Sequence, residues 1–585
     1  MQKRRRACEN CHVLKARCEP SEDAGDESCE RCYRAGKECI PAMRRLQRDR
    51  IAALEAQVQE LTNALQAQNL ANASPEPDAN KKRKLSDDVR VDPGYERSPA
   101  QVTNADFRFI DERVKWKVQL RVVEAYNEQH SKVLPLLHAE PLDLEVLRAG
   151  NPILLLAILA FPTNGILELD LQLELVDRAM QDFASRLIAA GERSLELAQA
   201  LLIASYWFRM RYGSKHATIL QIVQLSTSMA IDLGIAGSHV THDPGTWFER
   251  SDQDLSLVGC RTWLSCFVTG SAMTTVIRRP DSNPWTPHHD TSLAYVKAHA
   301  RTVPQRTFCE IIQAELLCYR AVTRLGLCET SQPTVFASDY AKATVSQLRQ
   351  EIDNWTHQLP PDIRKPELLI YRHQALIYLN EPVLHTATNK ATFSAPFIPE
   401  RIAAADFASP VVTVDHVAAL YALKDSCHAV LDIVSGLAPE TIFATSPLFY
   451  TPRVLYALMI LAKLFVAVTA PGNTYGAVLS RDELKLPCYF GKMKKFSASL
   501  DGVDAASFTT KIIAAYKAIE EWYESYSAIV EQYERDTAQS DGHDPVYLEP
   551  LGLTEDLASL DTDLKAAEDD SWLHDLLSNQ TLLQQ

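Results

Sequence analysis

Helical periodicity dominates the chain from about residue 104 to residue 535. Apolar residues return every three or four positions, which is the spacing of an α-helix with one buried face. The clearest stretches are 195–206, 219–233, 309–325, 340–359 and 411–434. Glycines and prolines separate these stretches, and the alternating pattern of β-strands is scarce. The pattern predicts a large all-α domain over 104–535 without an internal repeat.

A shorter apolar period precedes this region. Over about two and a half heptads, mainly β-branched residues occupy the a positions and leucines the d positions, giving the set Ile51, Leu54, Val58, Leu61 and Leu65. This arrangement favours a parallel two-stranded coiled coil. We therefore predict that 44–68 is a connector followed by a short helix that forms a homodimer. An amphipathic helix packed on its own protein is the alternative.

Six cysteines in the first forty residues repeat one spacing, C-x2-C-x6-C: they are Cys8, Cys11, Cys18, Cys29, Cys32 and Cys39. A C-x2-C pair is suited to present two thiolates to one zinc, and each tetrahedral zinc needs four ligands. Six sulfurs fill eight positions only if two of them bridge. The repeat therefore predicts two zinc ions, with one bridging sulfur from each half.

Three other readings of these cysteines are disulfides, one four-cysteine zinc site, and redox C-x-x-C chemistry. Strongly basic flanks and the absence of a signal peptide weigh against disulfides. A single site leaves Cys18 and Cys39 unexplained at matching offsets. Redox chemistry lacks its usual βαβ surroundings.

Residues 1–43 resemble the DNA-binding domain of fungal binuclear zinc-cluster transcription factors. The resemblance is carried by the stretch CENCHVLKARC and the ten-residue link to the second half-motif, although this link is long for the family. It implies a zinc-stabilised two-helix module in which Cys8 and Cys29 bridge and the first helix reads a CGG triplet in the major groove. The implied DNA contacts are Lys15 to guanine, Arg17 to the backbone, His12, and the basic leader Lys3, Arg4, Arg5 and Arg6. His12 and Leu14 replace the basic residues that the family often has, which implies fewer phosphate contacts.

The helical region resembles the regulatory middle homology domain of the same family. The matching segments are 228–235, 261–263, 278–280, 355–360 and 371–385. The resemblance implies a domain that modulates activity and responds to a small-molecule effector. We predict that the matching residues serve core or interhelix packing, because none of them forms a catalytic motif.

Two segments have no apolar period. Residues 69–103 have the composition of a disordered linker and contain a basic cluster of the nuclear-import type: Lys81, Lys82, Arg83 and Lys84. Residues 536–585 hold twelve acidic residues and one lysine, with leucines between the acids. This composition is typical of disordered acidic activation tails, in which one helical face would be formed by Trp572, Leu573, Leu576 and Leu577. A solvated tail, or a last helix packed on the helical domain, is the alternative.

The net charge of −15 would by itself argue against nucleic-acid binding, but basic residues gather at the start and acidic residues at the end. No phosphate loop, nucleotide fingerprint or nucleophile elbow is present, so we do not expect an enzyme. Histidines at 239–242 and 288–289 lack a third metal ligand at useful spacing. The longest apolar run, 153–161, is too short to span a membrane, and the seven cysteines after Cys39 are expected to be buried thiols.

The sequence therefore predicts a nuclear, zinc-dependent, sequence-specific DNA-binding regulator of RNA polymerase II genes. We expect an activator that binds paired CGG-type triplets as a homodimer and contacts the transcription machinery through its acidic tail. A repressor, or a zinc module that binds proteins without specific DNA contact, is the alternative. A helical small-molecule sensor or enzyme with an incidental zinc domain is the third hypothesis.

Overall fold

The computed structural model of the chain describes residues 8, 11, 18, 28–36 and 39, and most of 104–539. The gaps within 104–539 are 132–140, 164, 211–217, 238, 242–248, 252–254, 280–282, 330–335, 386–410, 446 and 471. The chain forms two compact units, Met1–Glu96 and Arg97–Gln585. The predicted dimerisation helix, the linker with its nuclear-import cluster and the acidic tail lie outside the described residues.

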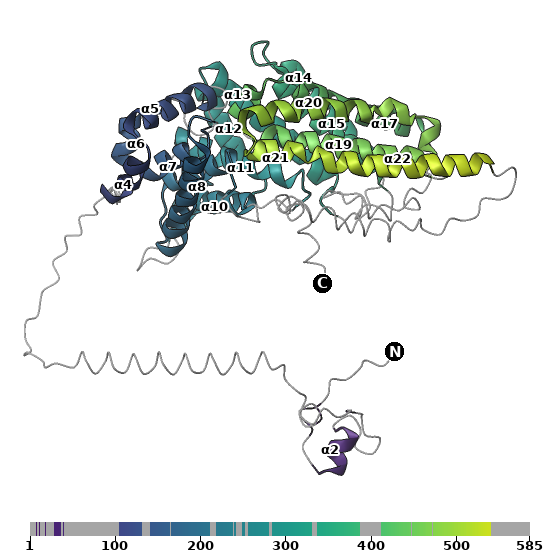
Figure 1. Cartoon of the computed structure of the whole chain (residues 1–585), viewed down its shortest axis with the longest axis horizontal. Helices are drawn as coiled ribbons and strands as arrows, with labels where there is room; N and C mark the ends of the chain where they lie inside the picture. Colours follow the sequence, from purple (N-terminus) through teal and green to yellow (C-terminus); the bar gives the residue numbers. More distant parts are fainter. Residues whose placement is uncertain are drawn as a thin grey trace, which may run out of the picture. The chain divides into compact units, whose positions relative to one another are not determined.

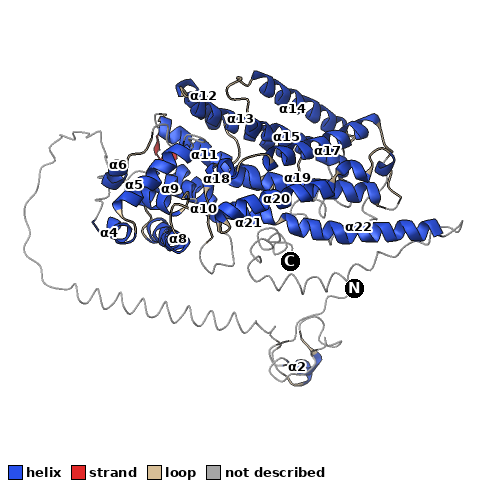
Figure 2. Cartoon of the chain, turned by 45° about the horizontal axis from the view of Figure 1, so that its top comes forward, coloured by secondary structure: helices blue, strands red, loops and turns tan. Residues whose placement is uncertain are grey.

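Helices make up nearly all of the regular structure described in the second unit (Figures 1 and 2). The α-helices are α4 (Asn104–Arg113), α5 (Trp116–Ala125), α6 (Leu144–Gly150), α7 (Pro152–Ala160), α8 (Leu169–Phe183), α9 (Leu195–Tyr206), α10 (Ile219–Asp232), α11 (Leu257–Thr274), α12 (Pro287–His299), α13 (Val303–Arg324), α14 (Asp339–Gln358), α15 (Pro366–Asn380), α17 (Val414–Ser435), α18 (Pro439–Ala444), α19 (Pro447–Thr469), α20 (Leu486–Asp504), α21 (Phe508–Ala514) and α22 (Tyr516–Gln539). Short π or 3-10 turns are η1 (Tyr126–Ser131), η2 (Ala184–Ala189), η3 (Glu381–Leu384), η6 (Tyr475–Ala477) and η7 (Arg481–Leu484).

Two short strands interrupt the helices. Strands β1 (His239–Thr241) and β2 (Glu249–Ser251) pair antiparallel, with Val240 opposite Arg250. Apart from this hairpin and the short turns, the predicted large helical domain is confirmed for the described residues.

Buried helices occupy the centre of the second unit. Every residue of α7 is buried, and so is every residue of α11 from Gly259 to Thr274. A helix that is apolar all round has no face suited to water, so it becomes the core on which amphipathic helices pack. Helix α14 is amphipathic: its buried positions recur every three or four residues, namely Ala341, Thr344, Leu348, Ile352 and Trp355.

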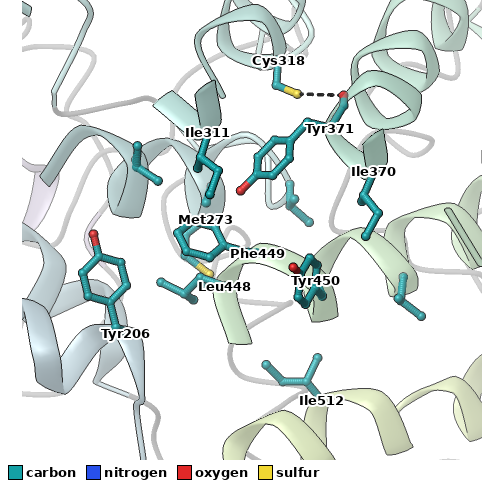
Figure 3. Close-up of a cluster of buried hydrophobic side chains, with 14 of the residues drawn as sticks. Tyr206, Met273, Ile311, Cys318, Ile370, Tyr371, Leu448, Phe449, Tyr450 and Ile512 are labelled. Atoms are coloured by element: carbon teal, nitrogen blue, oxygen red, sulfur yellow. Dashed lines mark hydrogen bonds between the residues drawn. The ribbon is translucent and has the colours of Figure 1, made fainter. Parts of the chain in front are cut away.

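Helices α11 and α19 connect the parts of this core. Helix α11 packs against α9 and α10 on one side and against α12, α13 and α19 on the other. Helix α19 also packs against α17, α21 and α22, and α22 follows it along the edge of the unit in Figure 1. Figure 3 shows aromatic and aliphatic side chains from several of these helices filling the space between them.

Helix α19 is apolar enough to resemble a membrane span. Its stretch Leu448–Thr469 passes that test by length and composition, but 94% of the most apolar window is buried inside the fold. Two cations, Arg453 and Lys463, lie within it and are both 1% exposed. Since each has a carboxylate partner in the core, we interpret α19 as the central helix of a packed domain.

Arg453 pairs with Glu315 of α13 and also compensates for a backbone hydrogen bond that is missing within α19. Pro452 lies inside the helix and has no backbone N–H to donate to the carbonyl of Leu448. The Arg453 guanidinium donates to that carbonyl at 3.2 Å and to the carbonyl of Phe449 at 2.6 Å. Its other arm donates to Glu315 at 2.5 Å. The arginine therefore satisfies a carbonyl that the proline leaves open and connects two helices.

Glu381 anchors the second group of buried charges. Its carboxylate lies 2.5 Å from Arg278 and 3.6 Å from Lys463, and Tyr456 donates its hydroxyl to it. His385 stands 3.5 Å away on the same turn. The predicted packing role of the segments 278–280 and 371–385 is confirmed here, because Arg278 and Glu381 join the end of α11 to η3 within the core.

Candidate metal centre

The cysteines of the two half-motifs make matching contacts. In the first, the backbone N–H of Cys8 donates to the sulfur of Cys18 at 3.4 Å. In the second, the N–H of Cys29 donates to the sulfur of Cys39 at 3.3 Å. The equal spacing in the sequence is thus matched by equal contacts in space.

The same correspondence holds within each C-x2-C pair. The N–H of Cys11 donates to the sulfur of Cys8 at 3.5 Å, and the N–H of Cys32 donates to the sulfur of Cys29 at 3.4 Å. Hydrogen bonds from backbone N–H groups favour the thiolate over the thiol. The turns of both pairs are therefore arranged to stabilise negative sulfur.

Four sulfurs from the two halves meet in one buried cluster. Those of Cys8, Cys11, Cys29 and Cys32 all lie within 4.8 Å of one another, and the residues are 1–5% exposed. Cys18 and Cys39 pack against this group and are partly buried. All six cysteines are free thiols, with no disulfide among them.

The distances between sulfurs fit a tetrahedral metal. Cys8 lies 3.7 Å from Cys29 and 3.6 Å from Cys32, and Cys11 lies 3.7 Å from Cys29. Thiolates bound at about 2.3 Å to one tetrahedral zinc lie about 3.8 Å apart. A disulfide would instead bring two sulfurs to about 2.05 Å. The four cysteines can therefore hold a metal ion.

The thiols influence one another's pKa. The pKa of Cys29 is lowered to about 6, first because the backbone N–H of Cys32 donates to its sulfur; burial opposes this shift and the neighbouring thiols reinforce it. The pKa of Cys11 is raised, first by burial and then by the thiols of Cys8, Cys29 and Cys18. A bound cation would favour the thiolate form of every one of these cysteines, because its positive charge stabilises all of the thiolates together.

Helix α2 (Glu30–Arg34) fixes the second half-motif. Cys29 is its N-cap, so its sulfur serves both the helix end and the cluster. Arg34 donates to Glu30 one turn away at 2.6 Å. Gly36 follows the helix at φ 60°, a left-handed conformation that glycine adopts without strain. The chain can therefore turn sharply after α2 and bring Cys39 back to Cys29.

The structure brings together all six predicted metal ligands. The predicted DNA contacts, Lys15, Arg17, His12 and the basic leader, lie outside the described residues. So do Ile51 to Leu65, Lys81 to Lys84, and the tail residues Trp572 to Leu577. Their predicted roles are taken up under the proposed function.

The histidine pair at 288–289 has structural contacts. His288 makes a hydrogen bond from Nε2 to the carbonyl of Ile235 at 3.0 Å. His289 completes the capping box of α12 with Thr286. Its ring stacks on Trp263 and Trp285, with centroid distances of 4.6 and 4.9 Å. These rings join α12 to α11.

Sequence reasoning missed the pairing of the buried charges and one pocket in the helical unit. Arg453 and Lys463 stand inside an apolar helix, where a charge is costly unless paired, and this signal could have marked them. Their partners could not be found from spacing, because Glu315 lies 138 positions from Arg453. Two polar residues that line this pocket, Tyr371 and Glu367, belong to no sequence pattern that would mark them.

Comparison with known proteins supports a transcription regulator. The chain is 21% identical over 564 residues to Transcription factor pbcR of Emericella nidulans, covering 89% of this chain and 71% of that protein. It is 22% identical over 367 residues to Transcription factor opdL of Penicillium oxalicum, covering 58% of this chain and 61% of that protein. No family model and no solved structure matches the chain. Proteins of this class are typically not enzymes and are usually nuclear.

Proposed function

We propose that the chain is a nuclear, zinc-dependent regulator that binds specific DNA sequences and controls transcription by RNA polymerase II. The observation that carries the proposal is the matched pair of cysteine half-motifs, whose sulfurs lie at the separation of zinc thiolates. The fungal relatives named transcription factors supply the context. The helical unit would be regulatory and not catalytic.

The cluster would hold two zinc ions. Cys8 and Cys29 would be the bridging ligands, because the sulfur of each lies within 3.7 Å of two sulfurs of the other half-motif. One metal would then take Cys11 and Cys18, and the other Cys32 and Cys39. Six thiolates around two divalent ions leave a formal charge of about −2, which the basic leader offsets.

DNA contact would come from the first half-motif. Lys15 would donate to guanine O6 and N7, which is the most common specific contact in the major groove. Arg17, His12 and the leader Lys3 to Arg6 would bind phosphates and fix the register. The helix over 51–65 would pair two copies, so that the connector sets the spacing of paired CGG-type triplets.

The remaining segments complete the proposal. Lys81 to Lys84 would direct nuclear import, and the acidic tail around Trp572 would recruit the transcription machinery as an activator. Whether the tail activates or represses transcription can be tested separately from DNA binding. Deletion of 536–585 is expected to abolish activation of a reporter gene while leaving DNA binding intact; loss of repression instead would make the chain a repressor.

Random-sequence DNA selection with the full-length chain, purified with zinc, tests the central claim. Paired CGG-type triplets at one fixed spacing are expected. Enrichment of single triplets would support specific DNA binding by the cysteine module and exclude the dimer. No enrichment, from protein shown by mass spectrometry to carry two zinc ions, would favour a module that binds proteins.

Replacement of one lysine separates base reading from charge. Lys15→Ala is expected to weaken binding by about 1–3 kcal/mol on the selected site and to relax the preference for the triplet. Equal weakening on all sequences would make Lys15 a phosphate contact. Lys494→Met, on the exposed face of α20, is the matched control and should leave DNA binding unchanged.

A further inference from the structure

A pocket opens in the helical unit between the starts of α13, α15 and α19. Its volume is about 220 Å³. Its walls are mainly apolar and aromatic, and Figure 3 shows four of them, Ile311, Tyr371, Phe449 and Tyr450. The exposed Lys365 lies at its rim. The pocket is thus formed by segments far apart in the sequence and exists only in the folded unit.

Two residues that line this pocket each have a buried polar atom without a hydrogen-bond partner. These atoms are the hydroxyl oxygen of Tyr371 and one carboxylate oxygen, Oε2, of Glu367. Burying a polar atom without a partner is costly, and such atoms are uncommon in folded proteins. Both residues lie on the first two turns of α15. A bound molecule that supplies partners would remove both penalties at once.

The surrounding contacts hold the Tyr371 ring in place. The guanidinium of Arg453 lies over it, 4.3 Å from the ring centroid. Its backbone carbonyl accepts a hydrogen bond from the thiol of Cys318 at 3.7 Å. In Figure 3 the hydroxyl points toward Ile311, which also lines the pocket. Burial raises the pKa of Tyr371 well above its usual value, so the hydroxyl keeps its proton and can both donate and accept.

Two threonine hydroxyls of the lining, those of Thr307 and Thr445, are already used as donors. Thr307 donates to the carbonyl of Val303 at 2.9 Å, and Thr445 donates to that of Thr441 at 2.9 Å. Both oxygens can still accept a hydrogen bond, as can Glu367. A ligand that carries a hydrogen-bond donor would complement these acceptors.

The size and the walls limit the ligand further. A dry cavity of about 150 Å³ holds one benzene ring, so about 220 Å³ holds a two-ring molecule or one ring with a short substituent. Aromatic walls favour flat aromatic ligands that stack or meet them edge to face. We propose that this pocket binds a one- or two-ring aromatic molecule that carries an O–H or N–H donor, held by Glu367 and Tyr371.

This binding activity goes beyond DNA recognition and can be measured without DNA. Indole and benzofuran form a matched pair of probes, because they have nearly the same shape and only indole carries an N–H donor. Calorimetric titration of the full-length chain should give a Kd for indole on the order of 0.1 mM. Benzofuran should bind about fivefold more weakly, because it leaves the acceptor unpaired.

Conservative variants test the two polar groups. Tyr371→Phe removes a hydroxyl that has no partner, so the unfolding temperature should stay the same or rise while indole binding weakens about threefold or more. Glu367→Gln keeps the size of the side chain and should reduce the preference for indole over benzofuran. Tyr378→Phe, which changes a tyrosine of the same helix outside the pocket, is the control and should bind both probes as the unchanged chain does.

Each outcome decides the proposal. No binding of indole to the folded wild-type chain would overturn it. Equal binding of the two probes would refute the role of a donor. An unchanged indole affinity in both Tyr371→Phe and Glu367→Gln would place the bound probe elsewhere. Because DNA is absent from the experiment, failure here leaves the proposed DNA-binding function untouched.

Discussion

Lys463 is expected to destabilise the helical unit at neutral pH. Its side chain is 1% exposed in the middle of α19, and its ammonium nitrogen lies 3.6 Å from a carboxylate oxygen of Glu381. Glu381 already holds Arg278 at 2.5 Å. One carboxylate therefore faces two buried cations, with the imidazole of His385 and the hydroxyl of Tyr456 as its other neighbours.

The pKa of Lys463 gives the size of this effect. Burial lowers it from 10.5 to about 8, even though the attraction of Glu381 raises it and Arg278 lowers it further. The folded state thus holds this proton less tightly than the unfolded state, so stability should rise with pH between about 8 and 10.5. Below pH 8 the penalty is fully present. A shift of this size corresponds to about 3 kcal/mol.

Lys463→Met is the perturbation that tests this reasoning, because methionine has similar length without the charge. At pH 7 the variant should be more stable by about 3 kcal/mol. For a cooperative unit of roughly 430 residues, unfolding entropy makes 1 kcal/mol worth about 1 °C, so Tm should rise by about 3 °C. At pH 9.5 the advantage should fall to less than half of that value, because above pH 8 the folded lysine gives up its proton and no longer buries a charge.

Thermal unfolding of the full-length chain, followed by circular dichroism at both pH values, measures this difference. The comparison with Lys463→Met cancels the titration of the groups that do not interact with Lys463. Lys494→Met is the control for loss of a surface lysine and should change stability by less than about 0.5 kcal/mol. A lower Tm for Lys463→Met at pH 7, or an advantage that does not shrink at pH 9.5, would refute the reasoning.

Three further predictions follow from the buried groups and the metal centre. Glu381→Gln removes the buried carboxylate that contacts both Arg278 and Lys463 and should lower the unfolding free energy by about 3–5 kcal/mol; an unchanged Tm in a thermal melt would contradict the assigned pairing. Arg261→Met should stabilise the chain by about 1–2 kcal/mol, because this guanidinium is 2% exposed and two of its nitrogens have no hydrogen-bond partner. The same melts measure it, and a loss of stability would refute it. Cys11→Ser should lower the zinc content determined by mass spectrometry and abolish specific DNA binding, whereas full zinc content would remove Cys11 from the ligand set.

Local helix signals were largely readable from the sequence. The pattern over 195–206 gives both ends of α9, because Ser194 caps the helix start with its side chain and apolar residues continue to Tyr206. Helix α13 begins at Val303, six residues before the predicted start at 309. Its first turn is closed by a capping box between Thr302 and Gln305, with few apolar residues to extend the period. Cap chemistry, and not periodicity, sets that boundary.

Long-range pairing was beyond the sequence. The pattern correctly placed the segments around Arg278 and Glu381 in packing roles, but their contact spans 103 positions. Neither segment contains a sequence pattern that identifies the other as its partner, because a buried cation can pair with any buried carboxylate. The pocket illustrates the same limit, because its walls come from several helices and the two unpartnered oxygens become unusual only after folding.

The cysteine cluster was predictable for a physical reason that does not apply to the core. Metal ligands must meet within a few ångströms, so their short, repeated spacing is imposed by the geometry of the ion. The described buried apolar cluster of the first unit consists of cysteines alone, whereas the second unit buries a large continuous core. Such a module would gain its stability from a bound metal. The spacing of the cysteines in the sequence therefore indicates the metal site that would hold the first unit together. The contacts that stabilise the second unit are defined only by its tertiary structure.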